Sequence, residues 1–280
     1  MSKIRIKELN REDRSCFYYV LGFIQARRTW KRILELTIQN KDPYLVYFTR
    51  CLRRLVYLFD NKEEIVVEYM RNHSGYYVRF RIHKGNLYEL IFRETNGLTG
   101  SPQSIIGRSS LLRIYLRGAF DSRGRVGYTI RRIMRSDIER VVPRFELRKK
   151  RGVFWLKQIS SLLREIFAVS ANVWSDSKGY LMRINSLKSL EALIKQGLVS
   201  GPKREKLENL IQNYNELMEI DYRGRYGEIL EKINARKRKR AKFSNQYDEE
   251  MDVRRLLDER LKRIRLARLS SLGIQEYDDI

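Results

Sequence analysis

The chain has 280 residues, of which 42% are apolar, and it contains 17 tyrosines and 11 phenylalanines. This composition can bury a substantial core, which argues against an intrinsically disordered chain. Its 58 lysines and arginines against 34 acidic residues give a formal charge of +24. A field of this size attracts polyanions, so we expect a partner that carries phosphates rather than a membrane surface.

The N-terminal segment lacks the apolar stretch of a secretory signal, and no uncharged apolar run approaches the roughly 18 residues of a membrane span. Cys16 and Cys51 lie in apolar helical patterns, which is typical of buried free thiols in a reducing compartment. We therefore expect an intracellular protein, cytoplasmic or nucleoid-associated, or else located in an organelle.

The first part of the chain predicts a mixture of helices and strands. Apolar residues recur at helical spacing or alternate with polar ones, Asp42-Pro43 is typical of a helix start, and residues 72–75 are typical of a hairpin turn. The expected elements are a helix at residues 12–26, a strand at 29–39, a helix at 43–59, strands at 64–71 and 75–83, and a helix at 86–94.

The second part repeats this order after a connection rich in Gly, Ser and Pro at residues 95–104. Its expected elements are a helix that ends at Gly124, strands at 125–132 and 141–150, a helix at 154–167, strands at 171–174 and 180–184, and a helix at 186–196. The simplest description is an α+β protein of two pseudo-symmetric αββαββα units, at residues 1–97 and 98–200.

Residues 201–280 predict a charged helical extension. Residues 203–219 form one amphipathic pattern, residues 251–269 form another, and a basic run lies between them. The second pattern leaves open a docking role toward a protein or ribonucleoprotein partner. We expect the protein itself to be a monomer.

Two segments carry the strongest functional signal. Residues 116–124 read LRGAFDSRG, and residues 20–28 read VLGFIQARR. Both resemble the signature helix of the LAGLIDADG homing endonucleases, and the resemblance extends over about residues 12–200. Residues 115–120 are also similar to a bacterial sporulation-regulator family, which joins a LAGLIDADG-like domain without nuclease activity to a helix-turn-helix. The tail here has no clear helix-turn-helix pattern.

The resemblance implies that the two motif helices pack closely through small residues, which are Gly22 and Gly118 here. It also implies saddle-shaped antiparallel sheets that lie along double-stranded nucleic acid, and a metal-binding carboxylate at the eighth position of each motif. Those eighth positions are Arg27 and Arg123. Because a guanidinium cannot bind magnesium, we expect no catalytic residue, no metal and no other cofactor.

The acid nearest to the second motif position is Asp121, which points to nearly the opposite side of its helix. We interpret it as a structural residue that bonds a neighbouring turn or an arginine. Seven tyrosines could suggest base stacking, but most of them lie at core spacing, so we expect packing instead. They are Tyr18, Tyr19, Tyr47, Tyr57, Tyr76, Tyr77 and Tyr88.

The expected nucleic-acid contacts are cations of the motif ends, the strands and the tail. Alternation along the strand at 75–83 puts Arg79 and Arg81 on one face and Val78, Phe80 and Ile82 on the other, facing helices. The full set is Arg27, Arg28, Arg32, Arg79, Arg81, Arg123, Arg125, Arg131, Arg132, Arg148, Arg236, Lys237, Arg238, Lys239 and Arg240.

Three functions are compatible with these features. The leading hypothesis is a nuclease-inactive protein that binds double-stranded DNA through metal-independent phosphate contacts, as a regulator or architectural factor. The alternative is an RNA-binding protein that contacts structured RNA, either an intron-splicing maturase or a component of a ribosome or another ribonucleoprotein. An active endonuclease is the weakest hypothesis, because its metal chemistry would have to operate beside two arginines.

Overall fold

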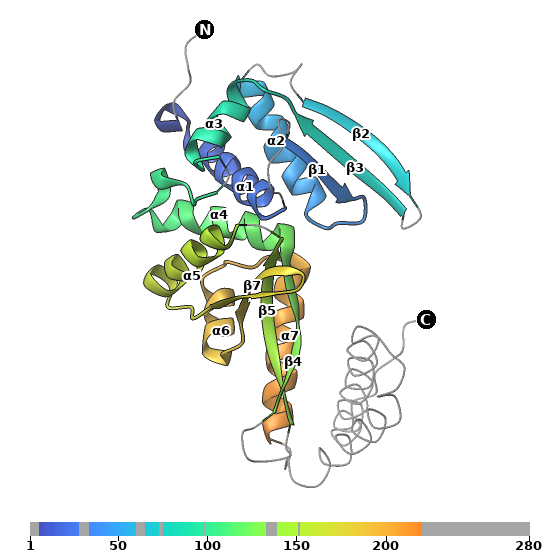
Figure 1. The fold of residues 1–280 in the computed structure, drawn as a ribbon, viewed down its shortest axis with the longest axis vertical. Coiled ribbons are helices and arrows are strands. Elements are labelled where there is room, and N and C mark those ends of the chain that lie inside the picture. The colour runs from blue at the N-terminus through green and yellow to red at the C-terminus, as the bar shows by residue number, and fades with distance from the viewer. Residues whose placement is uncertain are drawn as a thin grey trace, which may run out of the picture. The chain divides into compact units, whose positions relative to one another are not determined.

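The computed structural model describes residues 6–27, 34–59, 65–72, 75–97, 99–132, 139–150 and 152–219 (Figure 1). The chain divides into two compact units, of which one is Met1–Gly127 with Pro143–Ile211 and the other is Tyr128–Val142 with Gln212–Ile280. Both motif helices lie in the first unit. The division into residues 1–97, 98–200 and 201–280 stays a prediction.

The elements follow the predicted alternation of helices and strands, which confirms the α+β class. The first half contains 3-10 helix η1 (Ile6–Glu8), α1 (Arg11–Arg27), β1 (Leu34–Gln39), α2 (Leu45–Phe59), β2 (Ile65–Asn72), β3 (Gly75–Ile82) and α3 (Asn86–Glu94). The second half contains 3-10 helix η2 (Gln103–Ile105), α4 (Ser109–Arg123), β4 (Gly124–Arg132), β5 (Glu139–Lys149), α5 (Val153–Phe167), β6 (Asn172–Asp176), β7 (Gly179–Ile184) and α6 (Leu187–Lys195), and α7 (Gly201–Glu219) follows.

The second half has the αββαββα order, whereas the described residues of the first half have one strand fewer between their first two helices. Two antiparallel sheets result. The first has three strands in the order β1-β3-β2, and the second has four in the order β4-β5-β7-β6. The hairpin predicted around residues 72–75 is the β2–β3 pair, with Asn72 opposite Gly75.

The inner face of the first sheet packs on helices. Val78, Phe80 and Ile82 of β3 are buried, as their alternation predicted, and Phe48 of α2 lies with its ring 5.3 Å from that of Phe80. Helix α2 presents an apolar stripe to this face. The Asp42 carboxylate accepts a hydrogen bond from the Tyr44 backbone N–H at 3.0 Å. This turn precedes α2, which begins at Leu45 rather than at residue 43 as predicted.

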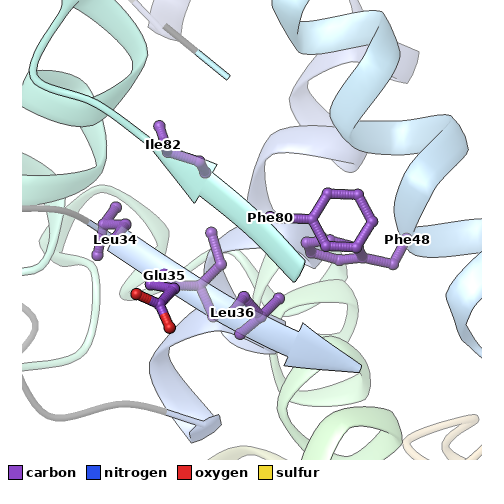
Figure 2. Close-up of a pocket in the computed structure, with 7 residues that line it drawn as sticks. Leu34, Glu35, Leu36, Phe48, Phe80 and Ile82 are labelled. Carbon is purple, nitrogen blue, oxygen red and sulfur yellow. The ribbon is translucent and has the colours of Figure 1, made fainter. Parts of the chain in front are cut away.

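A small pocket lies between this sheet and the helices, and Figure 2 shows six of the seven side chains that line it with labels. Its lining residues are Ile24, Leu34, Glu35, Leu36, Phe48, Phe80 and Ile82. Because Glu35 alone among them is polar, the pocket has too few polar partners to hold a charged ligand. We treat it as a gap in the core.

Among the helices that the structure describes, none combines the length with the apolar character that crossing a bilayer requires. Cys16 and Cys51 are free and buried, as predicted.

Candidate nucleic-acid interface

The two motif helices, α1 and α4, lie side by side in the first unit (Figure 1). Their backbones touch at two glycines. A Cβ atom on Gly22 would lie 2.0 Å from the Tyr115 carbonyl oxygen, and one on Gly118 would lie 2.1 Å from the Tyr19 carbonyl oxygen. Neither position has room for a side chain, so the small residue of each motif permits the close approach of the two helices.

Hydrogen bonds cross the contact between α1 and α4, which we call the seam, in a matched pattern. The Tyr19 hydroxyl of α1 donates to Asp121 Oδ2 of α4 at 3.2 Å, and the Tyr115 hydroxyl of α4 donates to Gln25 Oε1 of α1 at 2.5 Å. Gln25 is completely buried and Asp121 is 1% exposed. The two buried polar side chains are therefore each held by a tyrosine of the other helix.

A lysine binds the carbonyl groups near the end of each motif helix. Lys149 Nζ donates to the Gln25 carbonyl at 2.7 Å, and Lys203 Nζ donates to the Phe120 carbonyl at 2.9 Å and to the Asp121 carbonyl. These positions suit a cation, because the unpaired carbonyls of a helix C-terminus carry partial negative charge. Burial lowers the pKa of both ammonium groups to about 8.

Sequence analysis did not identify either lysine. Lys149 lies at the end of a strand and Lys203 lies in the first turn of α7, and neither position belongs to a motif. Only the packing of these elements on α1 and α4 brings the ammonium groups to the helix ends.

Asp121 is bonded to a neighbouring turn and lies near an arginine, as its position predicted. The Ser200 hydroxyl lies 3.0 Å from Asp121 Oδ1 and 2.8 Å from Oδ2, and Arg117 Nε lies 3.8 Å from Oδ2. Burial raises the pKa of the Asp121 carboxyl to about 6, against the opposing effects of Ser200 and Lys203. The carboxylate faces the interior rather than solvent.

Arg27, at the eighth position of the first motif, is enclosed by protein groups. Its Nη2 lies 2.8 Å from Asp42 Oδ2, its Nη1 donates to the Thr37 carbonyl at 2.8 Å, and its Nε donates to Ser122 Oγ of α4 at 3.0 Å. The side chain is 11% exposed. Burial lowers the pKa of the guanidinium, and the Asp42 carboxylate opposes this shift. Arg27 thus ties α1 to α4 and to the turn before α2.

Arg123, at the eighth position of the second motif, has a different environment. It is exposed, as is Arg125 two residues later at the start of β4. Neither guanidinium is paired with a carboxylate of the described residues. The two cations therefore face solvent beside the end of the seam, and both are free to bind an anion.

Arg79 and Arg81 of the first sheet are paired with acids. Arg81 Nη1 lies 2.9 Å from Glu68 Oε1, and Arg79 Nη1 lies 3.4 Å from Glu68 Oε2. Glu35 lies within 4 Å of both guanidinium groups. Both arginines lie on the outer face, as predicted, but this face combines two cations with two anions, and the strand register pairs Arg79 with Glu68 and Arg81 with Glu35.

The second sheet repeats this pairing on its outer face. Arg148 Nη1 lies 2.6 Å from Asp176 Oδ1, and Glu146 lies 2.6 Å from Arg183 and 3.4 Å from Arg144. Sequence analysis identified Arg148 but not the acids or the other two arginines. Glu146 meets Arg183 through the β5–β7 register, which composition does not reveal.

The remaining predicted contacts are described in part or not at all. Arg131 and Arg132 end β4, but their side chains are not described. Arg28, Arg32, the basic run at residues 236–240 and the amphipathic segment at 251–269 lie outside the described residues. In the described part of the chain, no group of three or more His, Cys, Asp or Glu side chains could hold a metal ion.

No protein-family model and no curated protein matches this sequence. Solved structures that resemble the chain include proteins described as LAGLIDADG proteins. The N-terminal LAGLIDADG domain of DUF199/WhiA is 16% identical, with 73% of this chain and 99% of that chain covered and a TM-score of 0.47. Full-length DUF199/WhiA from Thermatoga maritima is 15% identical, with 85% and 71% covered and a TM-score of 0.47. I-SmaMI bound to an uncleaved DNA target with calcium is 13% identical, with 81% and 97% covered and a TM-score of 0.47.

Proposed function

We propose that this chain is a LAGLIDADG-like protein that binds double-stranded DNA as a regulator or architectural factor and does not cut it. The observation that carries the proposal is the presence of Arg27 and Arg123 where the motifs would place metal-binding carboxylates. Asp121 does not replace them, because its carboxylate is 1% exposed and hydrogen-bonded to Ser200 and Tyr19. Metal-assisted hydrolysis needs negative ligands that are open to the phosphate.

Phosphate binding falls mainly to Arg123 and Arg125 in this proposal. Both are exposed and have no carboxylate partner in the described part of the chain. A guanidinium can bind a phosphate through two parallel hydrogen bonds. Arg79 and Arg81 would have to leave Glu35 and Glu68 first, so they would add less to the affinity. Arg27 keeps its protein partners and shapes the site without touching DNA.

Duplex binding by an Arg123→Gln/Arg125→Gln variant tests this assignment. Each lost phosphate contact should reduce the slope of log affinity against log salt by about 0.9, so the double variant should lose about 1.8. Arg164→Gln, a change of an exposed arginine on α5, should leave the slope unchanged. Fluorescence anisotropy with a labelled duplex at several salt concentrations gives both values.

The same duplex measured with magnesium and with a chelator tests the metal independence, and equal affinities are expected at matched ionic strength. Plasmid incubated with magnesium or manganese should stay intact. Reproducible nicking that Asp121→Asn abolishes would contradict the proposal of inactivity. Tighter binding of structured RNA than of duplex DNA in direct competition would instead support the RNA-binding alternative.

A further inference from the structure

The β2–β3 hairpin carries two tyrosines whose side chains are largely exposed. Tyr69 is 83% exposed and Tyr76 is 62% exposed. Tyr76, like Tyr57, which is 69% exposed, therefore does not follow the expectation that most of the seven tyrosines pack in the core. An aromatic ring left in water forgoes the favourable free energy that it would gain if a partner buried it.

Strand pairing places the two rings on one face of the sheet. Tyr69 lies opposite Val78, and Tyr76 lies opposite Arg71. Residues opposite each other point to the same side, and so do alternate residues along a strand. Val78 is buried against the helices, so Tyr69, Arg71 and Tyr76 continue the inner face past the helices that cover it. Figure 1 shows this hairpin extending away from α1 and α2.

Arg71 adds a cation to this face. Its guanidinium carbon lies 5.4 Å from the centre of the Tyr76 ring, within the range of a cation–π contact. The residue is exposed, and no carboxylate of the described residues pairs with it. Arg79 and Arg81 of the same hairpin, by contrast, are paired with Glu68 and Glu35 on the opposite face.

The partner is indicated by the combination of flat rings and a guanidinium that no carboxylate of the described residues pairs with. A chain of charge +24 attracts polyanions, and a polyanion that also covers aromatic rings is a nucleic-acid strand with unpaired bases, because those bases stack on aromatic side chains. Paired bases of a duplex expose only their edges and backbone. The face formed by Tyr69, Arg71 and Tyr76 therefore suits a single strand and not the duplex of the proposed function.

We propose that Tyr69, Arg71 and Tyr76 form a platform on which unpaired bases of single-stranded RNA or DNA stack. This proposal does not depend on duplex binding, since it uses other residues, on the opposite face from the paired arginines.

The test compares the full chain with a Tyr69→Ala/Tyr76→Ala variant by anisotropy, on a short single-stranded RNA, a single-stranded DNA of the same sequence and the matching duplex. Loss of stacked bases should weaken single-strand binding about tenfold or more, while duplex binding should change less than about twofold. The Tyr69→Phe/Tyr76→Phe variant keeps both rings and should bind as the parent chain does. Tyr57→Ala removes an exposed tyrosine of α2 and serves as the matched control.

An abasic strand separates stacking from charge. The parent chain should bind it more weakly than the base-bearing strand of equal length, and the double alanine variant should lose this difference. The salt slope should stay constant in the tyrosine variants and fall by about 0.7 in Arg71→Gln. Unchanged single-strand affinity in the alanine variant, or an equal loss on duplex and single strand, would overturn the platform. Tighter binding of either the RNA or the DNA strand shows which nucleic acid supplies the stacked bases.

Discussion

The ends of α1 and α4 each carry an arginine, and the two arginines lie in opposite environments. Arg27 is bound by Asp42, Thr37 and Ser122 and is 11% exposed, whereas Arg123 is exposed and has no carboxylate partner among the described residues. One guanidinium has become part of the scaffold, and the other faces solvent. The same position in two similar sequence motifs therefore does not imply the same environment, because the surrounding elements decide which groups are within reach.

The two helices are most alike at the seam where their glycines touch the other helix. Substitutions of these glycines should lower the free energy of unfolding more than the other changes considered below. Gly22→Ala and Gly118→Ala each place a Cβ atom about 2 Å from a backbone carbonyl oxygen, which cannot move aside as a flexible side chain can. We expect each change to destabilise the fold by about 3 kcal/mol or more. Urea unfolding measures the loss.

Gly100→Ala is the control for this pair, because its Cβ atom would lie 3.5 Å from Gln158 Oε1, at ordinary contact distance. It should cost less than about 1 kcal/mol. Similar losses in all three variants would show that the two helices are not in backbone contact at these glycines.

Replacing the two arginines in turn should sharpen the contrast between them. Arg27→Gln leaves Asp42, which is 17% exposed, without its cation and removes the donor to Ser122. We expect a loss of about 2 to 3 kcal/mol, somewhat below that for a fully buried pair. Arg123→Gln should change stability by less than about 0.5 kcal/mol. Equal losses in urea unfolding would remove the distinction between the two sites.

The two helix ends should also differ in their response to pH. The pKa of Asp121 is raised from 3.8 to about 6, so the folded state binds more protons than the unfolded state between these values. Its stability contribution is complete below about pH 4 and is lost as pH rises through 6. Gln25, the matching residue of α1, does not titrate.

Unfolding of the parent chain and of Asp121→Asn between pH 4 and 7 measures this effect. The parent should lose about 2 kcal/mol relative to the variant across that range, because a shift of about two pKa units is worth about 3 kcal/mol in full and part of the change falls below pH 4. Parallel pH profiles would mean that Asp121 titrates in the folded chain as it does in the unfolded one.

Local patterns were sufficient to predict much of the fold. Helical spacing identified α1, a turn motif identified the β2–β3 pair, and alternation assigned Val78 and Phe80 to the core. Each of these depends on neighbours within a few positions, where the backbone geometry is fixed.

The environment of the site could not be predicted in the same way. Lys149 and Lys203 reach the ends of α1 and α4 only through packing between distant segments, and Asp42 meets Arg27 only because the turn before α2 lies beside α1. Tyr76 has the alternation of a core residue, but its strand continues past the helices that would cover it. Periodicity shows on which side of a strand a residue lies, but it does not show how far the helices extend over that side of the sheet.

The contact between Gly22 and the Tyr115 carbonyl, and between Gly118 and the Tyr19 carbonyl, also fixes how the two helices are aligned along their length. One residue inserted between Tyr19 and Gly22 would turn the glycine by about 100° and shift it by about 1.5 Å, so that a bulkier neighbour would meet α4. The connections outside the helices can vary in length, but within these two turns the spacing of residues cannot change by even one.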